Sequence, residues 1–313
     1  MAKVIVGIHG LANKPKRTVL KKYWIDSIKE GLRKNCNVRT PAFDYKMVYW
    51  ADLLYHTQQH DDPLFSFDKL YNDEPYIDGA PGPFELHEDG VTDTVMASVL
   101  GLFGAGIDVA KEKFNMEGLA DWVLGKVLKD LDFYYDETRK IGDRSKPKKA
   151  VLARTVLMDE LKNALLPLKG KEIMLIAHSM GTIIAYDVLR DIGRSDPDFE
   201  LSQFITIGSP LGLPHVKKNI IDERAYSGLK KNRVRTPTVV TGRWVNYADR
   251  KDPVALDVHL KDDYGKNKRG VQVEDDLVAN RYESPAGKAN HHKSYGYLRT
   301  PELSTHIKEF LES

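Results

Sequence analysis

Short apolar runs of strand length recur along the chain and alternate with segments whose apolar residues repeat at helical spacing. The runs do not alternate with polar residues, which is typical of parallel strands that helices cover on both faces. The predicted strands are Lys3–Ile8, Phe43–Trp50, Ile173–Ala177, Phe204–Ile207 and Val239–Tyr247. Strands that alternate with helices predict an α/β fold with a doubly wound, mostly parallel sheet.

Four helices are predicted between and after these strands. One begins near Thr18, one runs through Leu157–Leu168, and one passes through Ile183–Leu189 before Gly193 ends it. Near the end of the chain Thr300 is the expected cap and Pro301 occupies the first turn of the last helix. The inner face of that helix is expected to consist of Leu303, Ile307, Phe310 and Leu311.

Residues 52–149 interrupt the alternation. They are rich in Asp, Pro and Gly, and they contain two predicted helices, around Thr94–Lys113 and Leu119–Leu131. The basic run Arg139–Lys149 contains a proline and is expected to be an exposed connector. We therefore predict an α/β core of residues 1–51 and 150–313, with residues 52–149 forming a helical insertion, a cap or lid, over one end of the sheet.

Composition narrows the function classes. The chain has 313 residues, with 47 Lys and Arg against 45 Asp and Glu, so its formal charge is +2. This balance argues against a nucleic-acid partner or a polybasic membrane tether. The single cysteine, Cys36, excludes an internal disulfide and any multi-cysteine metal site. No stretch has the length of a membrane span and the start lacks the features of a signal peptide, so a cytoplasmic location is expected.

The clearest chemical signal is Ala177-His178-Ser179-Met180-Gly181, between a predicted strand and a predicted helix. A nucleophile elbow needs this context, because a sharp turn there raises the serine hydroxyl above the edge of the sheet. Small residues two positions away let strand and helix backbones approach, and Ala177 stands where glycine is usual. Ser179 is the predicted nucleophile, and the helix start behind it favours a developing negative charge.

Two backbone N–H groups are candidates for an oxyanion hole. His9-Gly10-Leu11 ends the first strand, where a second donor is expected, so the N–H of Leu11 would act together with that of Met180. His9 is expected to brace this loop and not to act as a base.

A serine nucleophile needs a base, and the base needs an orienting carboxylate. Asp249 and Asp252 both follow the strand that ends at Tyr247, and Asp252 is preferred because Pro253 restricts its backbone. His292 is the preferred base and His291 the alternative, since both precede an aromatic segment that leads into the last helix. Surface or packing roles are expected for His215, His259 and His306.

Together these segments resemble the α/β-hydrolase fold, in its lipase and esterase branch. The resemblance is carried by His9-Gly10-Leu11, the Ser179 elbow, Gly208-Ser209-Pro210, Asp252-Pro253-Val254, and His292 with Tyr295. Their order along the chain, Ser then Asp then His, is that of the family. The resemblance covers about two thirds of the chain and leaves the insertion out.

The resemblance implies a cytoplasmic serine hydrolase that cleaves a carboxylic ester through an acyl-enzyme, with no cofactor and no metal in the reaction. The expected partner is a small-molecule ester or acyl substrate, with lipid contact through the insertion as a further possibility. An amidase, a thioesterase or an acyltransferase would use the same three side chains. A non-catalytic binding protein on a hydrolase scaffold is the alternative from another class.

Three weaker signals have simpler explanations. His56 and His60 have metal-ligand spacing for a helix and precede Asp61, but the stretch is polar and a solvated loop is expected. Gly101–Gly106 is rich in glycine without matching a nucleotide-binding motif, and it suits a lid helix. The basic residues between 217 and 235 are expected to form a solvated face.

Overall fold

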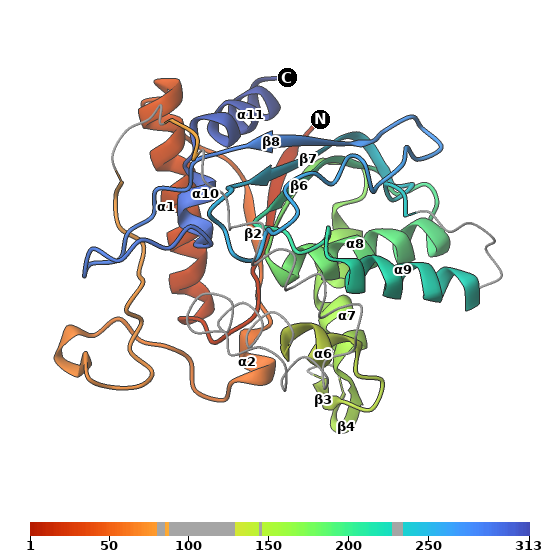
Figure 1. Ribbon diagram of the computed structural model, residues 1–313, viewed down its shortest axis with the longest axis horizontal. Helices are drawn as coiled ribbons and strands as arrows, with labels where there is room; N and C mark the ends of the chain where they lie inside the picture. Colours follow the sequence, from red (N-terminus) through yellow and green to blue (C-terminus); the bar gives the residue numbers. More distant parts are fainter. Residues whose placement is uncertain (80–84, 88–128, 144–145, 227–233) are drawn as a thin grey trace.

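A six-stranded sheet in which every neighbouring pair is parallel forms the centre of the protein (Figure 1). The structure is a computed structural model that describes residues 1–79, 85–87, 129–143, 146–226 and 234–313. The strands, in spatial order, are β2 (Tyr45–Val48), β1 (Lys3–Ile8), β5 (Glu172–His178), β6 (Leu201–Ile207), β7 (Val240–Ala248) and β8 (Val273–Leu277). The predicted doubly wound, parallel α/β architecture is confirmed.

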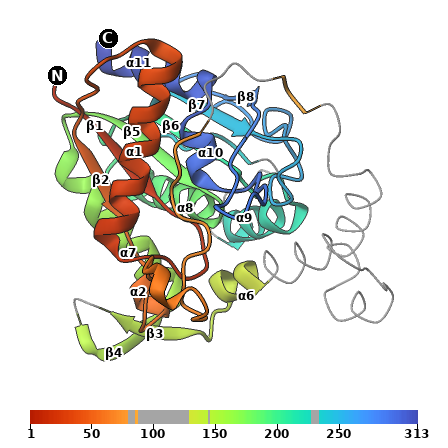
Figure 2. The same ribbon diagram turned by 90° about the vertical axis from the view of Figure 1, so that its left-hand side faces the viewer.

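Helices cover both faces of this sheet, which explains the unbroken apolar runs. Along β1, Val4 and Val6 pack into one core with residues of α7 (Ala153–Leu165), α8 (Met180–Ser195) and α9 (Pro214–Tyr226). Ile5 packs into the core on the opposite face, with α1 (Arg17–Cys36), α10 (Ser294–Leu298) and α11 (Pro301–Glu312). The two helical layers are visible in Figure 1, and Figure 2 shows both ends of the chain at the same end of the molecule.

The order of the strands reverses once within the sheet, and this reversal creates a switch point. From β1 the chain crosses outward to β2, and it then returns to add β5, β6, β7 and β8 on the other side of β1. In open α/β sheets, ligands bind in the crevice at the carboxyl ends of the strands where the order reverses. Here that point lies between β1 and β5, so the loop after Ile8 and the turn after His178 flank it.

Several of the described elements differ from the predicted ones. The strand β8 was not predicted, because its sequence Val-Glu-Asp-Asp-Leu is an acidic edge strand without an apolar pattern. The helix α9 occupies part of the predicted solvated basic stretch. The run Arg139–Lys149 is not a plain connector, since β3 (Lys140–Asp143) and β4 (Lys146–Leu152) pair as an antiparallel hairpin. The predicted strand Phe43–Trp50 is shorter, since β2 ends at Val48.

Much of the predicted insertion lies outside the described residues. This holds for the helix predicted at Thr94–Lys113, for Gly101–Gly106, and for most of the helix predicted at Leu119–Leu131, of which the last residues belong to α6 (Lys129–Tyr135). Within the described part, a four-residue helix α2 (Ala51–Leu54) and a short 3₁₀ helix η1 (Pro63–Phe65) precede it. A second 3₁₀ helix, η3 (Leu166–Leu168), extends α7. The division into core and insertion stays a prediction.

Among the helices that the structure describes, none has the length and apolar character to cross a membrane.

A buried histidine joins α11 to the sheet. His306 of α11 contacts the Tyr247 hydroxyl through Nδ1 at 2.8 Å and the Gln203 Oε1 through Nε2 at 3.1 Å. A neutral ring satisfies both contacts, with Nε2–H donating to Gln203 and Nδ1 accepting from Tyr247. Burial, and then the charge of Arg243, lowers the pKa of His306 from 6.5 to about 4. The predicted packing role of this residue agrees with these contacts.

This histidine makes the free energy of unfolding depend on pH. The unfolded chain takes up a proton on His306 below about pH 6.5, whereas the folded protein resists it down to about pH 4. Stability should therefore fall as the pH drops through this window. His306→Gln, whose amide is neutral throughout, should show a shallower fall in urea-unfolding free energy. The exposed His259, changed to Gln, is the control; equal slopes for wild type and His306→Gln would contradict the assignment.

Candidate active site

Ser179 lies at a sharp turn between β5 and α8. Its backbone has φ 56° and ψ −133°, in a region that residues with a side chain rarely adopt. Its N–H donates to the Ile207 carbonyl at 3.1 Å, and its carbonyl accepts from the Thr182 N–H at 2.9 Å. The turn thus has the strand–turn–helix context that the sequence predicted for an elbow.

Two glycines make this turn possible by leaving space for neighbouring backbone. A Cβ on Gly181 would lie 2.7 Å from the His9 carbonyl oxygen, so a side chain there would separate α8 from the end of β1. A Cβ on Gly10 would lie 2.6 Å from the Cβ of Ser179 and 3.0 Å from its hydroxyl oxygen. The loop after β1 therefore lies directly against the serine.

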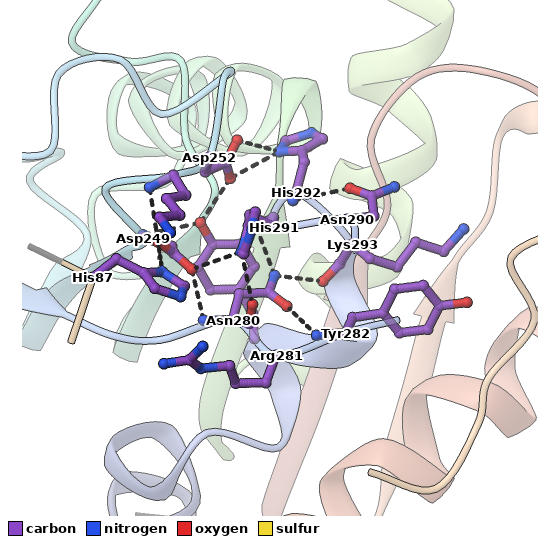
Figure 3. Close-up of polar contacts among 12 residues, drawn as sticks. His87, Asp249, Asp252, Asn280, Arg281, Tyr282, Asn290, His291, His292 and Lys293 are labelled. Atoms are coloured by element: carbon purple, nitrogen blue, oxygen red, sulfur yellow. Dashed lines mark hydrogen bonds and ion pairs between the residues drawn. The ribbon is translucent and has the colours of Figure 1, made fainter. Parts of the chain in front are cut away.

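The three preferred residues of the sequence analysis form one hydrogen-bonded chain. The Ser179 hydroxyl and Nε2 of His292 are 2.9 Å apart. On the other side of the ring, Nδ1 of His292 lies 2.9 Å from both carboxylate oxygens of Asp252 (Figure 3 shows this contact). Because Nδ1 faces an acceptor-only carboxylate, it carries the proton, and Nε2 is left to accept from the serine hydroxyl.

Asp252 is fully buried and held by donors in addition to the histidine. The Val254 N–H donates to its Oδ1 at 2.8 Å, and the Tyr297 hydroxyl donates to its Oδ2 at 2.6 Å. Gly208, with φ 54°, gives this carboxylate room, because a Cβ there would lie 2.7 Å from Oδ2. Sequence reasoning noted the glycine but missed Tyr297, whose only signal was its place in a short aromatic segment.

The loop that carries His292 is fixed by its neighbours. Nε2–H of His178 donates to the His292 carbonyl at 2.8 Å, and the two rings lie 4.7 Å apart. Burial, together with His292, holds the pKa of His178 far below its usual value, so this ring stays neutral. The Asn290 side chain accepts the His292 N–H at 3.0 Å. These contacts set where the imidazole lies before any substrate is bound.

His9 braces the loop after β1, in agreement with the sequence interpretation. Its Nε2 accepts the Trp50 N–H at 3.1 Å, so its proton is on Nδ1, which donates to the Gly10 carbonyl at 2.7 Å. Its ring stacks on Trp50. Burial and the charge of Lys14 lower the pKa of His9 to about 3, which leaves it neutral.

The two alternative residues, Asp249 and His291, form a second cluster and do not extend the first. Oδ1 of Asp249 contacts Nδ1 of His87 at 2.7 Å, and Oδ2 lies 3.5 Å from Nδ1 of His291. His87 was missed by the sequence analysis because nothing around it in the chain marks it. The clusters meet at Tyr297, whose hydroxyl accepts the Asp249 N–H at 3.1 Å while donating to Asp252.

The two predicted oxyanion donors come from the segments that flank the serine. Met180 is the first residue of α8, so its N–H has no acceptor within the helix. Leu11 follows Gly10 in the loop after β1 and lines the same cavity as Ser179. Their N–H groups are therefore on the two sides of the switch point.

A cavity of about 230 Å³ opens in front of Ser179. Apolar parts of its wall come from Leu11, Leu20, Trp24 and Val254. Much of the rest is charged or amidic, and it includes Lys14, Gln59, Asn72, Asp73, Glu74, Asn290 and Lys293. Lys293 forms an ion pair with Glu74 at 3.0 Å. The cavity can thus hold a small ligand with polar groups.

The histidines with weaker sequence signals do not line the cavity in front of Ser179. His56 to His60 form a loop and not a helix, so their four-residue spacing does not place them side by side, and His60 lies 3.7 Å from Asp68. His215, the second residue of α9, is half-buried against the ring of Tyr135. His259 is exposed.

Comparison with protein-family models finds none that matches the chain, and comparison with curated proteins finds no relative.

The contact between Gly10 and the serine gives a test that needs no substrate. Gly10→Ala forces its methyl group into the side chain of Ser179, so we expect a loss of about 1–3 kcal/mol of unfolding free energy, as for other overpacked positions. Urea unfolding measures it. Gly142→Ala is the matched control, because a Cβ there meets nothing within 4 Å. A Gly10→Ala protein as stable as the control would contradict the close approach.

Proposed function

We propose that the protein is a serine hydrolase of the α/β-hydrolase fold that cleaves a carboxylic ester. The observation that carries the proposal is the chain of contacts from Ser179 through His292 to Asp252, at 2.9 Å on each side of the imidazole. A hydroxyl, a neutral imidazole and a buried carboxylate in this order form the arrangement that makes serine nucleophilic. The position at the switch point of the sheet supports it further.

Acylation would proceed through these groups in turn. Nε2 of His292 takes the hydroxyl proton while the Ser179 oxygen bonds to the ester carbonyl carbon, and Asp252 stabilises the imidazolium. The carbonyl oxygen becomes an oxyanion that the N–H groups of Leu11 and Met180 stabilise, each by about 3 kcal/mol. Collapse breaks the bond to the alcohol oxygen, which takes the proton from His292 and departs.

Deacylation would repeat the sequence with water. His292 takes a proton from a water molecule, whose oxygen attacks the carbonyl carbon of the acyl-serine. The tetrahedral intermediate then breaks its bond to Ser179, and the proton returns from His292 to the serine oxygen. The products are a carboxylic acid and the regenerated enzyme.

The cavity favours a short acyl group that carries polar atoms. Its volume of about 230 Å³ is below the roughly 300–1,000 Å³ of sites that enclose drug-sized ligands. A long alkyl chain would also leave the ion pair of Glu74 and Lys293 against apolar surface, at a cost in desolvation. We therefore propose short-chain carboxylic esters as the substrate class.

The alternatives separate on simple measurements. An amidase, a thioesterase or an acyltransferase would share the acylation step and differ in leaving group or acceptor, so parallel amide and thioester substrates distinguish them. A binding protein on the same scaffold would turn over none of them.

The first kinetic prediction concerns Ser179. Hydrolysis of p-nitrophenyl esters from acetate to palmitate should be fastest for the short chains. Ser179→Ala should lower turnover by about 10⁶ with unchanged melting temperature, because the three side chains act as a unit. Ser209→Ala is the control: Ser209 is buried nearby but bonds Thr182 at 2.9 Å instead. Activity retained in Ser179→Ala, or lost equally in both variants, would refute the assignment.

The second kinetic prediction separates the two His–Asp pairs. Asp252→Asn should lower turnover by about 10⁴, since an amide favours the wrong tautomer of His292. Asp249→Asn should chiefly lower the melting temperature, because its carboxylate accepts the N–H groups of Lys251 and Asn280.

The two histidines should differ in the same way. His292→Ala should abolish activity, and His291→Ala should retain most of it. The reverse ranking of either pair would move the reaction to Asp249 and His291.

A further inference from the structure

A second group of ligating side chains lies behind the three residues of the proposed reaction. His87, Asp249 and His291 come from three separate segments, and one ligand atom from each lies within 4.8 Å of the others (Figure 3). It is the one such group of three among the described residues. The rings of His87 and His291 meet edge to face, 4.8 Å apart. The carboxylate of Asp249 lies against both.

The carboxylate is fixed before any ligand arrives. Asp249 has no exposed surface, and its oxygens accept the N–H groups of Lys251 at 2.8 Å and Asn280 at 2.7 Å. A carboxylate buried and oriented in this way is a preorganised metal ligand whose outer contacts are already made.

The hydrogen bonds within the cluster do not satisfy every ring nitrogen of its two imidazoles. The His87 side chain is 5% exposed, and its Nε2 has no hydrogen-bond partner in the structure. Nδ1 of His291 divides its contact between the Asn280 carbonyl at 3.0 Å and Asp249 at 3.5 Å. Hydrogen bonds thus satisfy the Asp249 carboxylate, whose two oxygens accept up to about four of them, but they leave Nε2 of His87 buried without a partner.

We propose that His87, Asp249 and His291 bind a divalent transition metal ion, with Zn²⁺ as the chemically best-suited ion. Two imidazole nitrogens and one carboxylate oxygen are zinc ligands, and the carboxylate balances part of the ion's charge. The separation of 3.5 Å between Nδ1 of His291 and Oδ2 of Asp249 suits two ligands of one tetrahedral ion. The imidazole nitrogens would bind it in their unprotonated form, releasing protons to solvent.

Such an ion would have a structural role. It would join segment 85–87 to the loop that carries His291. The next residue of that loop is His292, the base of the proposed reaction. The proposal does not depend on the proposed hydrolysis, because none of the three side chains contacts Ser179 in the described structure.

The test uses the whole chain without a histidine tag, stripped with EDTA and dialysed, with Zn²⁺ alone as the probe. Elemental analysis after desalting should find one zinc per chain, and the melting temperature should rise with added Zn²⁺. In place of zinc, Co²⁺ should give the visible absorption of a four-coordinate ion. A wild-type protein that keeps no zinc, or whose melting temperature does not respond, overturns the proposal.

The decisive variant is His87→Asn, whose amide can still donate to Asp249 but lacks the imidazole ligand. We expect its zinc affinity to fall by at least about 100-fold while its metal-free melting temperature stays near that of wild type. His291→Asn serves if His87→Asn does not fold. Two controls, His259→Ala on the surface and Ser179→Ala, should bind zinc as wild type does. Zinc binding that survives His87→Asn and His291→Asn, or that is lost in His259→Ala, assigns the ion to another site.

Discussion

The strained turn at Ser179 is the constraint on which the arrangement of the site depends. A residue with a side chain at φ 56° costs about 1–3 kcal/mol and persists only where its surroundings enforce it. Here the Ile207 carbonyl holds the serine N–H, and Gly10 and Gly181 let the end of β1 close over the turn. Without these two approaches, the serine side chain and the loop after β1 could not both reach the crevice between β1 and β5.

The same edge of the sheet brings together groups that are far apart in the sequence. The loop after β1, the turn after β5, Gly208 after β6 and Asp252 after β7 all follow the carboxyl ends of neighbouring parallel strands. The histidine reaches them from the segment before α10, where His178 holds its carbonyl. The buried rings of His9 and His178, which burial keeps neutral, brace this edge without adding charge.

The parts of the fold that sequence could predict are those where local physics and tertiary structure agree. The central strands β1, β5, β6 and β7 contain apolar runs because helices cover both faces of the sheet, and the elbow has a short-range signature around Ser179. In contrast, β8 is specified by contacts outside it, such as the pair of Glu274 with Arg243 at 2.8 Å, and its own sequence is acidic. The hairpin of β3 and β4 was likewise hidden in a basic segment with a proline.

The candidate site divides in the same way. Ser179, Asp252 and His292 could be selected because each lies beside a strand end or an aromatic segment with a known pattern. Asp249 and His291 stayed open as the less favoured alternatives, since the directions of neighbouring loop side chains are set only in three dimensions. His87 carries no local signal, and Tyr297 has none beyond its place in a short aromatic segment. Their places depend on long-range packing, which joins residue 87 to residue 249 and residue 297 to residue 252.

The central claim is that Ser179 is an activated nucleophile, and covalent labelling of the unmodified protein tests it most directly. A fluorophosphonate reacts with serine only where a base and an oxyanion site assist. After treatment of the folded chain, intact mass should increase by one adduct, and peptide mapping should place it on Ser179; the urea-unfolded chain should gain none. No adduct on the folded protein, or an adduct on another serine such as Ser209, would contradict the account.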